Sequence, residues 1–396
     1  MEQRMQEATE EHMKLKITLT SNNEGWNTAV NGKLLLELAG NPRVKVSGLV
    51  PRSTDKQRTH ARSLGIELFD AKDVPAVDNS ADLLAYPPDS LDIDVLIIHS
   101  FGRKLGRQAQ VIKEIKKCKW VHVLHTVSEE LVKIPENAKE HQSEHETQVA
   151  LCQKADLVIA IGPKVADAYR SALYPYGQDK KVIDLTPGLF HNFIGVRPSE
   201  QEREKFHVLI SGSLKYFKVK GCDIAARAIT LLNTQSSLYH LTFAVKPSED
   251  VSEITQCLLA EGLDPCQATV KVLESTDGWI SLLCEVDLAI KPSRIEGFGM
   301  SGLRAISADL PLLASGNTGL GMALKKLPFG NKCVVNSDDP CAWAEEIKKV
   351  YETDLQTRRL EAEELRNQYM EQFNWKEQCN NLVSRMVAMI PTKSDD

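Results

Sequence analysis

The chain has 396 residues, 42% of them hydrophobic and 26% charged, with 48 Lys and Arg against 54 Asp and Glu and a formal net charge of −6. At about 150 residues per domain this length predicts two or three domains, and the ordinary composition excludes wholesale disorder. A mildly acidic chain is poorly suited to bind nucleic acid or an anionic membrane in bulk, which excludes both classes of partner. The whole acidic excess lies after Arg197.

Nine cysteines, none of them spaced as C-x-x-C, indicate reduced thiols rather than a disulfide framework. The first residues are charged and lack the apolar core of a signal peptide. The longest apolar run, 157–161, is far shorter than the roughly 18 residues of a membrane span. We therefore expect a cytoplasmic protein without a transmembrane segment.

Short apolar runs alternate with longer amphipathic stretches, which is typical of βα units around a parallel sheet. In the first half we predict strands near 15–20, 44–50, 66–69, 94–98, 119–124, 156–161 and 181–185. Helices are predicted at 28–39, 55–64, 104–117, 140–154 and 164–173. Pro187 and Gly188 then break the pattern, and the charged segment 197–205 is predicted as a linker.

The second half repeats the alternation. Its strands are predicted at 207–211, 240–245, 269–273, 286–290, 311–314 and 332–335. Its helices are predicted at 221–233, 250–260, 277–284, 299–308, 339–351, 354–371 and 375–389, and the ends 1–13 and 391–396 as frayed tails. The simplest interpretation is two doubly wound α/β domains, 14–196 and 206–390, with the last helix able to pack back on the first domain. Such folds bind ligands at the carboxyl ends of their strands.

The densest functional signal is the segment 290–304, IKPSRIEGFGMSGLR. A predicted strand is followed by Glu296, by the glycines Gly297 and Gly299, and then by a helix. Glycines let the backbone approach a ligand closely, and a helix N-terminus presents free N–H groups to an anion. Residues 297–302 also satisfy G-x-G-x-x-G, but they lie far from the first strand of their domain, which disfavours a dinucleotide site. The alternative is a glycine-rich turn without a ligand.

A second signal is the segment 210–221, ISGSLKYFKVKG, at the end of the first strand of the second domain. Lys215, Lys218 and Lys220 concentrate positive charge in the acidic half of the chain. A lysine near a loop-to-helix junction suits a diphosphate, through its charge and through the helix dipole. The alternative is a solvated basic loop.

Histidines provide weaker signals. His141 and His145 match H-x-x-E-H, but no third ligand is identifiable, so a solvated helix face is favoured over a metal site. His99 and His125 each follow an apolar strand, and each is either a ligand contact or a structural histidine. The lysines of 113–119 indicate a helix end favoured by its dipole rather than a nucleic-acid patch.

Together these elements resemble the retaining glycosyltransferases of family 4, which have the GT-B fold of two Rossmann-like domains facing a cleft. The resemblance runs from about Leu15 to Met389. Its most specific segments are 292–299, 308–315, 155–162, 186–188 and 373–375. Segments 182–188 and 315–321 further resemble the glycosyltransferase-like domains of invertebrate animals, which often occur beside TPR or NACHT modules. The chain is therefore also a candidate module of a larger multidomain protein.

The resemblance implies that the second domain holds a nucleotide-diphosphate sugar, that the first holds the acceptor, and that a hexosyl group is transferred without a bound metal or other cofactor. It implies catalytic roles at the donor sugar for Glu296 and His125. The implied diphosphate contacts are Lys220, Lys215, Lys218, Ser213 and Gly212. The other implied contacts are Gly297, Phe298, Gly299 and Met300 with the phosphate and sugar, Leu273, Glu274 and Arg304 with the base and ribose, and Glu24 and Gly25 in an N-terminal loop.

Three departures from the family pattern lie in ligand-facing loops. The second glutamate of the E-x7-E motif, which usually accepts hydrogen bonds from the ribose, falls on Arg304. The arginine that normally accompanies Lys220 falls on Ser213, and the paired glycines of the N-terminal loop are replaced within residues 22–26. Loss of one charge-assisted hydrogen bond weakens nucleotide affinity by roughly 10- to 150-fold.

The leading hypothesis is a nucleotide-sugar-dependent retaining glycosyltransferase with altered donor recognition. The alternative is a catalytically impaired pseudo-glycosyltransferase that acts as a nucleotide or sugar sensor or as an interaction module. A third hypothesis is an epimerase or phosphorylase on the same fold. If Arg304 faces the ribose or phosphate it is a repurposed contact, and if it turns to solvent or to a neighbouring carboxylate the donor site is degraded.

Overall fold

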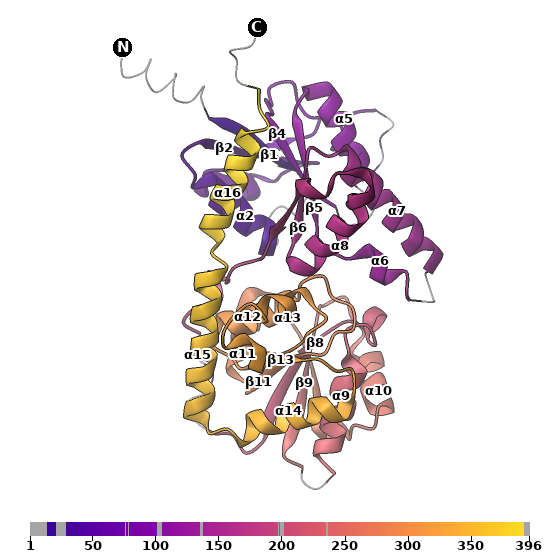
Figure 1. Cartoon of the computed structure of the whole chain (residues 1–396), viewed down its shortest axis with the longest axis vertical. Helices are drawn as coiled ribbons and strands as arrows, with labels where there is room; N and C mark the ends of the chain where they lie inside the picture. Colours follow the sequence, from indigo (N-terminus) through magenta and orange to yellow (C-terminus); the bar gives the residue numbers. More distant parts are fainter. Residues whose placement is uncertain are drawn as a thin grey trace. The chain divides into compact units, whose positions relative to one another are not determined.

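The computed structural model describes residues 14–20, 29–75, 77, 79–100, 105–134, 138–196, 198, 202–234 and 237–391. The predicted tail 1–13 and all of the predicted tail 391–396 except Pro391 lie outside this part of the chain. The chain divides into two compact units, each of which is an α/β domain (Figure 1). The first unit comprises 1–161, 165–187 and 375–396, and the second comprises 162–164 and 188–374.

The first unit is built on a parallel sheet of seven described strands in the order β3-β2-β1-β4-β5-β6-β7. The strands are β1 (Leu15–Thr20), β2 (Val44–Val50), β3 (Glu67–Asp70), β4 (Val95–Ser100), β5 (Lys119–Leu124), β6 (Leu157–Ile161) and β7 (Val182–Leu185). The helices are α2 (Ala29–Ala39), α3 (Asp55–Ser63), α4 (Ser80–Leu83), α5 (Gly106–Lys116), α6 (Ser128–Leu131), α7 (Ala138–Lys154), α8 (Pro163–Leu173) and α16 (Trp375–Val387).

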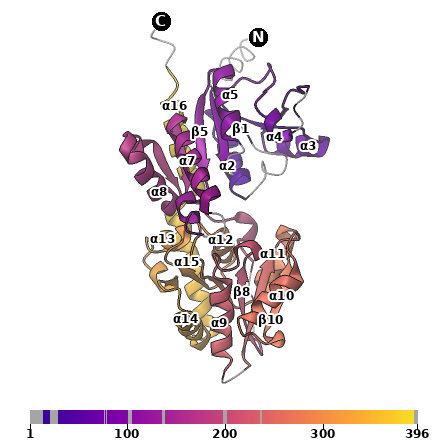
Figure 2. The same ribbon diagram turned by 90° about the vertical axis from the view of Figure 1, so that its right-hand side faces the viewer.

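The second unit is built on a parallel sheet of six described strands in the order β10-β9-β8-β11-β12-β13. The strands are β8 (Phe206–Ser211), β9 (Tyr239–Val245), β10 (Ala268–Val272), β11 (Leu288–Lys291), β12 (Leu312–Ser315) and β13 (Val334–Val335). The helices are α9 (Cys222–Leu232), α10 (Val251–Ala260), α11 (Thr276–Cys284), α12 (Met300–Ser307), α13 (Gly319–Leu324), α14 (Pro340–Glu352) and α15 (Leu355–Gln372). Figure 2 shows β10 and α10 at one side of this unit and α13 to α15 at the other.

The two sheets share the same order over the first six strands of each, the first sheet adds β7 at its edge, and all described strands are parallel, which confirms the predicted pair of doubly wound domains. The chain runs outward in both directions from a central pair, β1 with β4 in the first unit and β8 with β11 in the second. At such a switch point, ligands bind outside the carboxyl ends of the two strands. The loops that follow β8 and β11 are therefore where the site of the second unit is expected.

The alternation of apolar and amphipathic segments sets this fold. Residues 95–98 of β4 are fully buried, as expected of a parallel strand covered on both faces. Leu96 and Ile98 pack in a cluster that includes Trp120, and the second unit has its own cluster around Phe243 and Trp343. Each buried large apolar side chain contributes about 1.5–3 kcal/mol, so these cores hold the strand ends in place.

The predicted elements agree with the structure, and the differences have local causes. The short helices α4, α6 and α13 were not predicted, because one or two turns are too short to show a 3.6-residue period. The second unit begins at residue 188, upstream of the predicted linker. Leu189 and Phe190 are buried, and the backbone N–H of Phe190 donates to Ser307 Oγ of α12 at 3.0 Å, which fixes this segment to the second unit.

The last helix, α16, returns to the first unit and packs on α2. Asn41 Nδ2 donates to Asn380 Oδ1 at 2.9 Å, and Gln378 Nε2 donates to the carbonyl of Thr186 at 2.8 Å. Among the described residues, no helix is long and apolar enough to cross a bilayer.

Candidate functional site

The two strongest sequence signals meet at the switch point of the second sheet. Lys220 lies in the loop after β8, and Glu296 lies in the loop after β11. Lys220 Nζ donates to Glu296 Oε1 at 2.7 Å, and Ser293 Oγ lies 3.4 Å from Glu296 Oε2. The structure therefore brings together two residues that are 76 positions apart, at the edge where a doubly wound sheet binds its ligand.

A second lysine, which the sequence analysis missed, completes this cluster. Lys291 is the last residue of β11, its exposed fraction is 5%, and its Nζ lies 3.2 Å from Glu296 Oε2. A charged residue that ends the apolar strand Leu-Ala-Ile, five positions before Glu296, was the available signal. Lys220, Lys291 and Glu296, here called the Glu296 cluster, carry a net charge of +1 and are suited to an anionic ligand.

The charges of the Glu296 cluster stabilise one another. Burial alone would raise the pKa of the Glu296 carboxyl, but Lys291 and Lys220 together lower this pKa to about 2. Burial lowers the pKa of Lys291, and the nearby Glu296 carboxylate opposes that effect. At neutral pH Glu296 is therefore an ionised acceptor, able to receive hydrogen bonds from hydroxyl groups.

Arg294 fastens the two loops of the site to each other. Its guanidinium forms a bidentate pair with Asp223, at 2.7 and 2.9 Å, and donates to the carbonyl of Lys218 at 2.6 Å. The backbone N–H of Arg294 donates to the carbonyl of Val219 at 2.9 Å. Bidentate guanidinium–carboxylate pairs fix orientation as well as distance, so the loop after β8 is held in register with the loop after β11.

The glycine loop between Glu296 and α12 rests on α13. The backbone N–H of Leu320 donates to the carbonyl of Phe298 at 2.8 Å. A Cβ at Gly319 would lie 2.2 Å from the carbonyl oxygen of Gly297, so only glycine permits this approach. The loop leads directly into α12, which begins at Met300 and presents its first N–H groups at the same edge.

The other predicted diphosphate residues lie in the same loop but take no part in the cluster. Lys215 and Lys218 are exposed, and among the described residues neither forms an ion pair. Lys215 Nζ lies 5.3 Å from the ring centroid of Tyr216. Gly212 and Ser213 directly follow β8, and Ser213 makes no side-chain cap to the next turn. Of the three lysines, Lys220 alone reaches Glu296 among the described residues.

Arg304 does not turn to a carboxylate. Its guanidinium carbon lies 4.7 Å from the ring centroid of Trp279, a residue of α11. In the described part of the chain Arg304 has no ion pair, and burial lowers its pKa. Leu273 and Glu274, the predicted base contacts, form the turn between β10 and α11, and Glu274 is exposed. Sequence reasoning missed Trp279, because nothing in its local pattern marks it.

In the first unit, two histidines lie together at the carboxyl ends of neighbouring strands. His99 belongs to β4, His125 directly follows β5, and His99 Nδ1 lies 2.8 Å from His125 Nε2. Burial lowers the pKa of both, that of His125 to about 4, and the neighbouring His125 ring lowers the pKa of His99 further. The pair is therefore neutral at neutral pH. The predicted place of His125 beside a donor sugar stays a prediction, and Glu24 and Gly25 lie outside the described residues.

Burial of histidines predicts a pH dependence for the first unit. Burial lowers the pKa of His122 to about 4, while its unfolded-state value is 6.5. Between these values the unfolded chain binds the extra proton, so stability falls as the pH falls through this window. Hydrogen exchange measures the free energy of opening of β5, which we expect to fall in the wild type between about pH 7.5 and about pH 5. This fall should be about 2 kcal/mol larger in the wild type than in His122→Asn. His60→Asn, on exposed α3, is the control, and an equal drop in His122→Asn and wild type would contradict the assignment.

The solvated helix face predicted for the H-x-x-E-H segment is wrong for His141, which is buried. His141 Nδ1 lies 2.7 Å from the carbonyl of Leu131, and His145 Nδ1 lies 3.0 Å from Ser128 Oγ. Ser128 Oγ also lies 2.9 Å from the Tyr169 hydroxyl. Among the described residues, no group of three or more His, Cys, Asp and Glu side chains could hold a metal ion.

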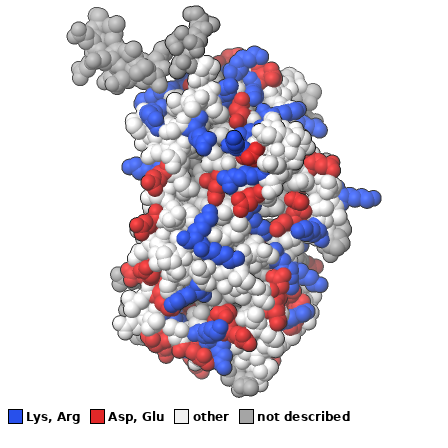
Figure 3. Space-filling view, in the orientation of Figure 1, with Lys and Arg blue, Asp and Glu red and all other residues white. Residues whose placement is uncertain are grey.

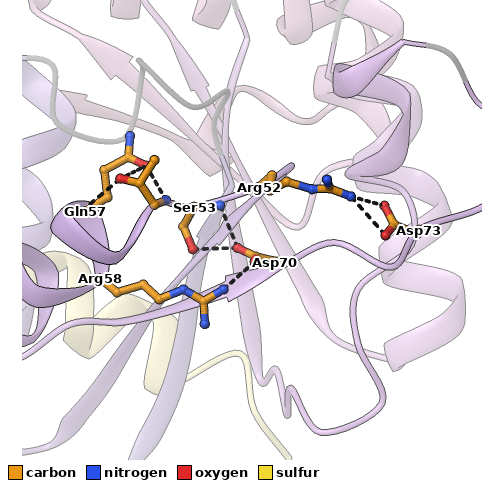
Figure 4. Close-up of polar contacts among 7 residues, drawn as sticks. Arg52, Ser53, Gln57, Arg58, Asp70 and Asp73 are labelled. Carbon is orange, nitrogen blue, oxygen red and sulfur yellow. Dashed lines mark hydrogen bonds and ion pairs between the residues drawn. The ribbon is translucent and has the colours of Figure 1, made fainter.

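Charged contacts also shape the carboxyl end of β2 and β3. Figure 4 shows Ser53 and Arg58 converging on Asp70, while Arg52 faces Asp73. The Asp70 carboxylate accepts from the Ser53 N–H at 2.8 Å, and Arg52 Nη2 donates to both oxygens of Asp73 at 2.7 and 3.0 Å. In each of these contacts the positive and the negative charge neutralise each other. Over the face drawn in Figure 3, basic and acidic side chains are likewise interspersed.

Comparison with known proteins identifies the family of the chain. A family model described as "Family 4 Glycosyltransferase in conflict systems" matches residues 18–382. The chain belongs to this family. This membership confirms the resemblance to family 4 that the sequence showed. The family consists of sugar-transferring enzymes.

Individual relatives are distant in sequence and close in fold. The D-inositol 3-phosphate glycosyltransferase of Corynebacterium urealyticum is 24% identical over 326 residues, which cover 76% of this chain and 73% of that protein. The sucrose-phosphate synthase of Thermosynechococcus elongatus has a TM-score of 0.69 at 14% identity, over 95% of this chain and 99% of that one. Anabaena HepE, solved with UDP and glucose, has a TM-score of 0.67 at 16% identity, over 94% and 100%. The fold is GT-B.

Proposed function

We propose that the chain transfers a hexosyl group from a nucleotide-diphosphate sugar to an acceptor hydroxyl, with retention of configuration as the family 4 resemblance implies. The observation that carries this proposal is the Glu296 cluster, which joins two lysines and an ionised carboxylate at the switch point of the second sheet. HepE, which shares the fold, was solved with UDP and glucose. That relative supports a nucleotide sugar as the donor.

The proposed donor contacts follow from the chemistry of each group. Lys220 binds the diphosphate, exchanging part of its contact with Glu296 for the phosphate oxygens. The ionised Glu296 accepts hydrogen bonds from the sugar hydroxyls, and the backbone at Gly297–Met300 approaches the phosphate. Leu273 and Glu274 face the base. Because protein cations and the N-terminus of α12 supply the positive charge, the proposal includes no metal ion.

Transfer breaks the bond between the anomeric carbon and the diphosphate oxygen, and the electron pair leaves with the diphosphate. The acceptor hydroxyl forms the new bond to the anomeric carbon, and its proton passes to the departing phosphate or to solvent. Negative charge therefore develops on the diphosphate, where Lys220 and the free N–H groups of α12 stabilise it. Fixed donors of this kind typically contribute about 10²- to 10³-fold in rate each.

Ligand-induced stabilisation tests the proposal. We expect a UDP, GDP or ADP sugar at millimolar concentration to raise the melting temperature, because a ligand that binds only the native state stabilises it. Lys220→Met should abolish this rise. Lys348→Met, at an exposed pair with Glu352 on α14, is the matched control and should keep it. Absence of any shift in the wild type over the whole nucleotide-sugar panel would overturn the proposal.

One observation favours a second candidate, a donor-binding protein without turnover. Ser213 supplies no cation beside Lys220, and the nearby Lys215 is turned toward Tyr216. A leaving diphosphate with one fixed lysine is less stabilised than one with two. Binding of a nucleotide sugar without hydrolysis or transfer would identify this candidate, and turnover that is lost in Glu296→Gln would exclude it.

A further inference from the structure

Arg304 is a cation that the proposed donor contacts leave unused. It lies in α12, four residues after Met300, and its guanidinium stacks on Trp279 with 4.7 Å between the guanidinium carbon and the ring centroid. In the described part of the chain it pairs with no carboxylate, although Glu296 is only eight residues earlier. A partly buried guanidinium without a counter-charge is costly unless a ligand supplies one.

The position of this cation relative to the donor contacts follows from the helices. Trp279 and Arg304 both lie about one turn from the start of their helices, α11 and α12. Helical side chains lean toward the N-terminus of their helix, so both reach toward the carboxyl ends of β10 and β11. The turn Leu273–Glu274 directly precedes α11. Arg304 is therefore placed on the nucleoside side of the proposed site, whereas Lys220 and Glu296 define the diphosphate and sugar side.

The hydrogen-bonding groups of Arg304 indicate which kind of ligand group it binds. A guanidinium has five N–H donors and no acceptor, and its planar fork matches two oxygens of a phosphate. The guanidinium lies over the Trp279 ring, and among the described residues no carbonyl or carboxylate accepts from its N–H groups, which leaves them for a ligand. Lys220 and the N-terminus of α12 already serve the donor diphosphate. The group that pairs with Arg304 is therefore a further anion on the nucleoside.

We propose that Arg304, held in place by Trp279, binds a phosphate on the ribose of the donor nucleotide. The donor is then a nucleotide-diphosphate sugar with a 2′- or 3′-phosphate. This inference rests on the proposed function, because it takes the diphosphate as bound by Lys220. It deepens that function by naming the class of donor.

Matched nucleotides test the inference by calorimetry. The probes are the 5′-diphosphates of adenosine, guanosine, uridine and cytidine, each alone and each with an added phosphate on the 2′ or 3′ oxygen. We expect at least one base for which the added phosphate tightens binding about 10- to 100-fold. Arg304→Gln should remove this gain, and Arg304→Glu should make the phosphorylated ribose bind more weakly than the plain one. Arg227→Gln, at an exposed arginine that pairs with Glu261, is the control and should keep the gain.

The remaining outcomes of this calorimetric experiment would overturn the inference in different ways. If the plain diphosphates bind and the added phosphate brings no gain in the wild type, the inference is overturned while the proposed function stands. If Arg304→Gln weakens plain and phosphorylated nucleotides equally, Arg304 is a contact of the diphosphate and the inference is again overturned. If no nucleotide of either set binds the wild type, the inference and the proposed function both fail.

Discussion

Replacing Glu296 by glutamine is expected to destabilise the second unit by about 3–5 kcal/mol, the usual cost of breaking a buried ion pair from one side. The substitution keeps the shape of the side chain and removes its charge. Lys220 can turn to solvent, since 26% of its side chain is exposed. Lys291 cannot, because its side chain is 6% exposed and lies at the end of β11. An uncompensated buried ammonium therefore accounts for most of the loss.

Urea denaturation of single and double variants measures this effect. The double variant Glu296→Gln with Lys291→Met removes the orphaned charge as well, so we expect it to recover most of the stability lost by Glu296→Gln. Glu361→Gln is the matched control, because its pair with Lys332 is exposed, with 69% of the lysine and 40% of the glutamate side chain accessible. That substitution should cost less than about 1 kcal/mol. A double variant no more stable than Glu296→Gln alone would show that Lys291 is not the source of the loss.

Lowering the pH should reproduce part of this loss of stability in the wild type. The pKa of Glu296 is about 2 in the folded chain and 4.5 for the unfolded reference, with Lys291 and Lys220 outweighing the effect of burial. The stabilisation is therefore fully present above about pH 4.5 and is lost as the pH falls toward 2. Glu296→Gln should lack this part of the acid transition.

The sequence was sufficient to predict both sheets because their strands are apolar on both faces and their helices are amphipathic. Burial of runs such as 95–98 leaves few alternatives to a parallel α/β arrangement. The lysines after β8 and the glycines after β11 could likewise be singled out as candidates, since ligands bind at strand ends. What a single sequence lacks is the pairing between distant loops. Lys291 and Trp279 acquire their importance from Glu296 and Arg304, and no local spacing records those contacts.

Arg304 is a second case in which the sequence alone could not predict the contacts of a residue. Motif comparison identified it as a departure from the family, and either a degraded or a repurposed site was consistent with that departure. The stacking on Trp279 favours the repurposed contact, because the guanidinium is held by an aromatic ring instead of being neutralised by a carboxylate. A cation held in this way keeps its N–H donors for a ligand.

Gly221→Ala is expected to open the site and to destabilise the second unit by about 3 kcal/mol or more. Gly221 has a φ of +69° and joins Lys220 to the start of α9. A Cβ at this position would lie 2.0 Å from the carbonyl oxygen of Pro292, in the loop that leads to Glu296. Because the obstructing atoms are backbone, the loops after β8 and β11 must move apart. The 2.7 Å contact between Lys220 and Glu296 joins the same two loops and should be lost with them.

Gly177→Ala provides a control with the same backbone strain and no collision. Its φ is +67°, and a Cβ there would meet no atom within 4 Å. It should therefore show only the cost of a left-handed alanine, about 1 kcal/mol. Urea denaturation gives the two losses, and the thermal shift with a nucleotide sugar reports the site. We expect the shift to vanish in Gly221→Ala and to persist in Gly177→Ala. Equal losses of stability in the two variants would mean that the approach of Gly221 to Pro292 does not hold the two loops together.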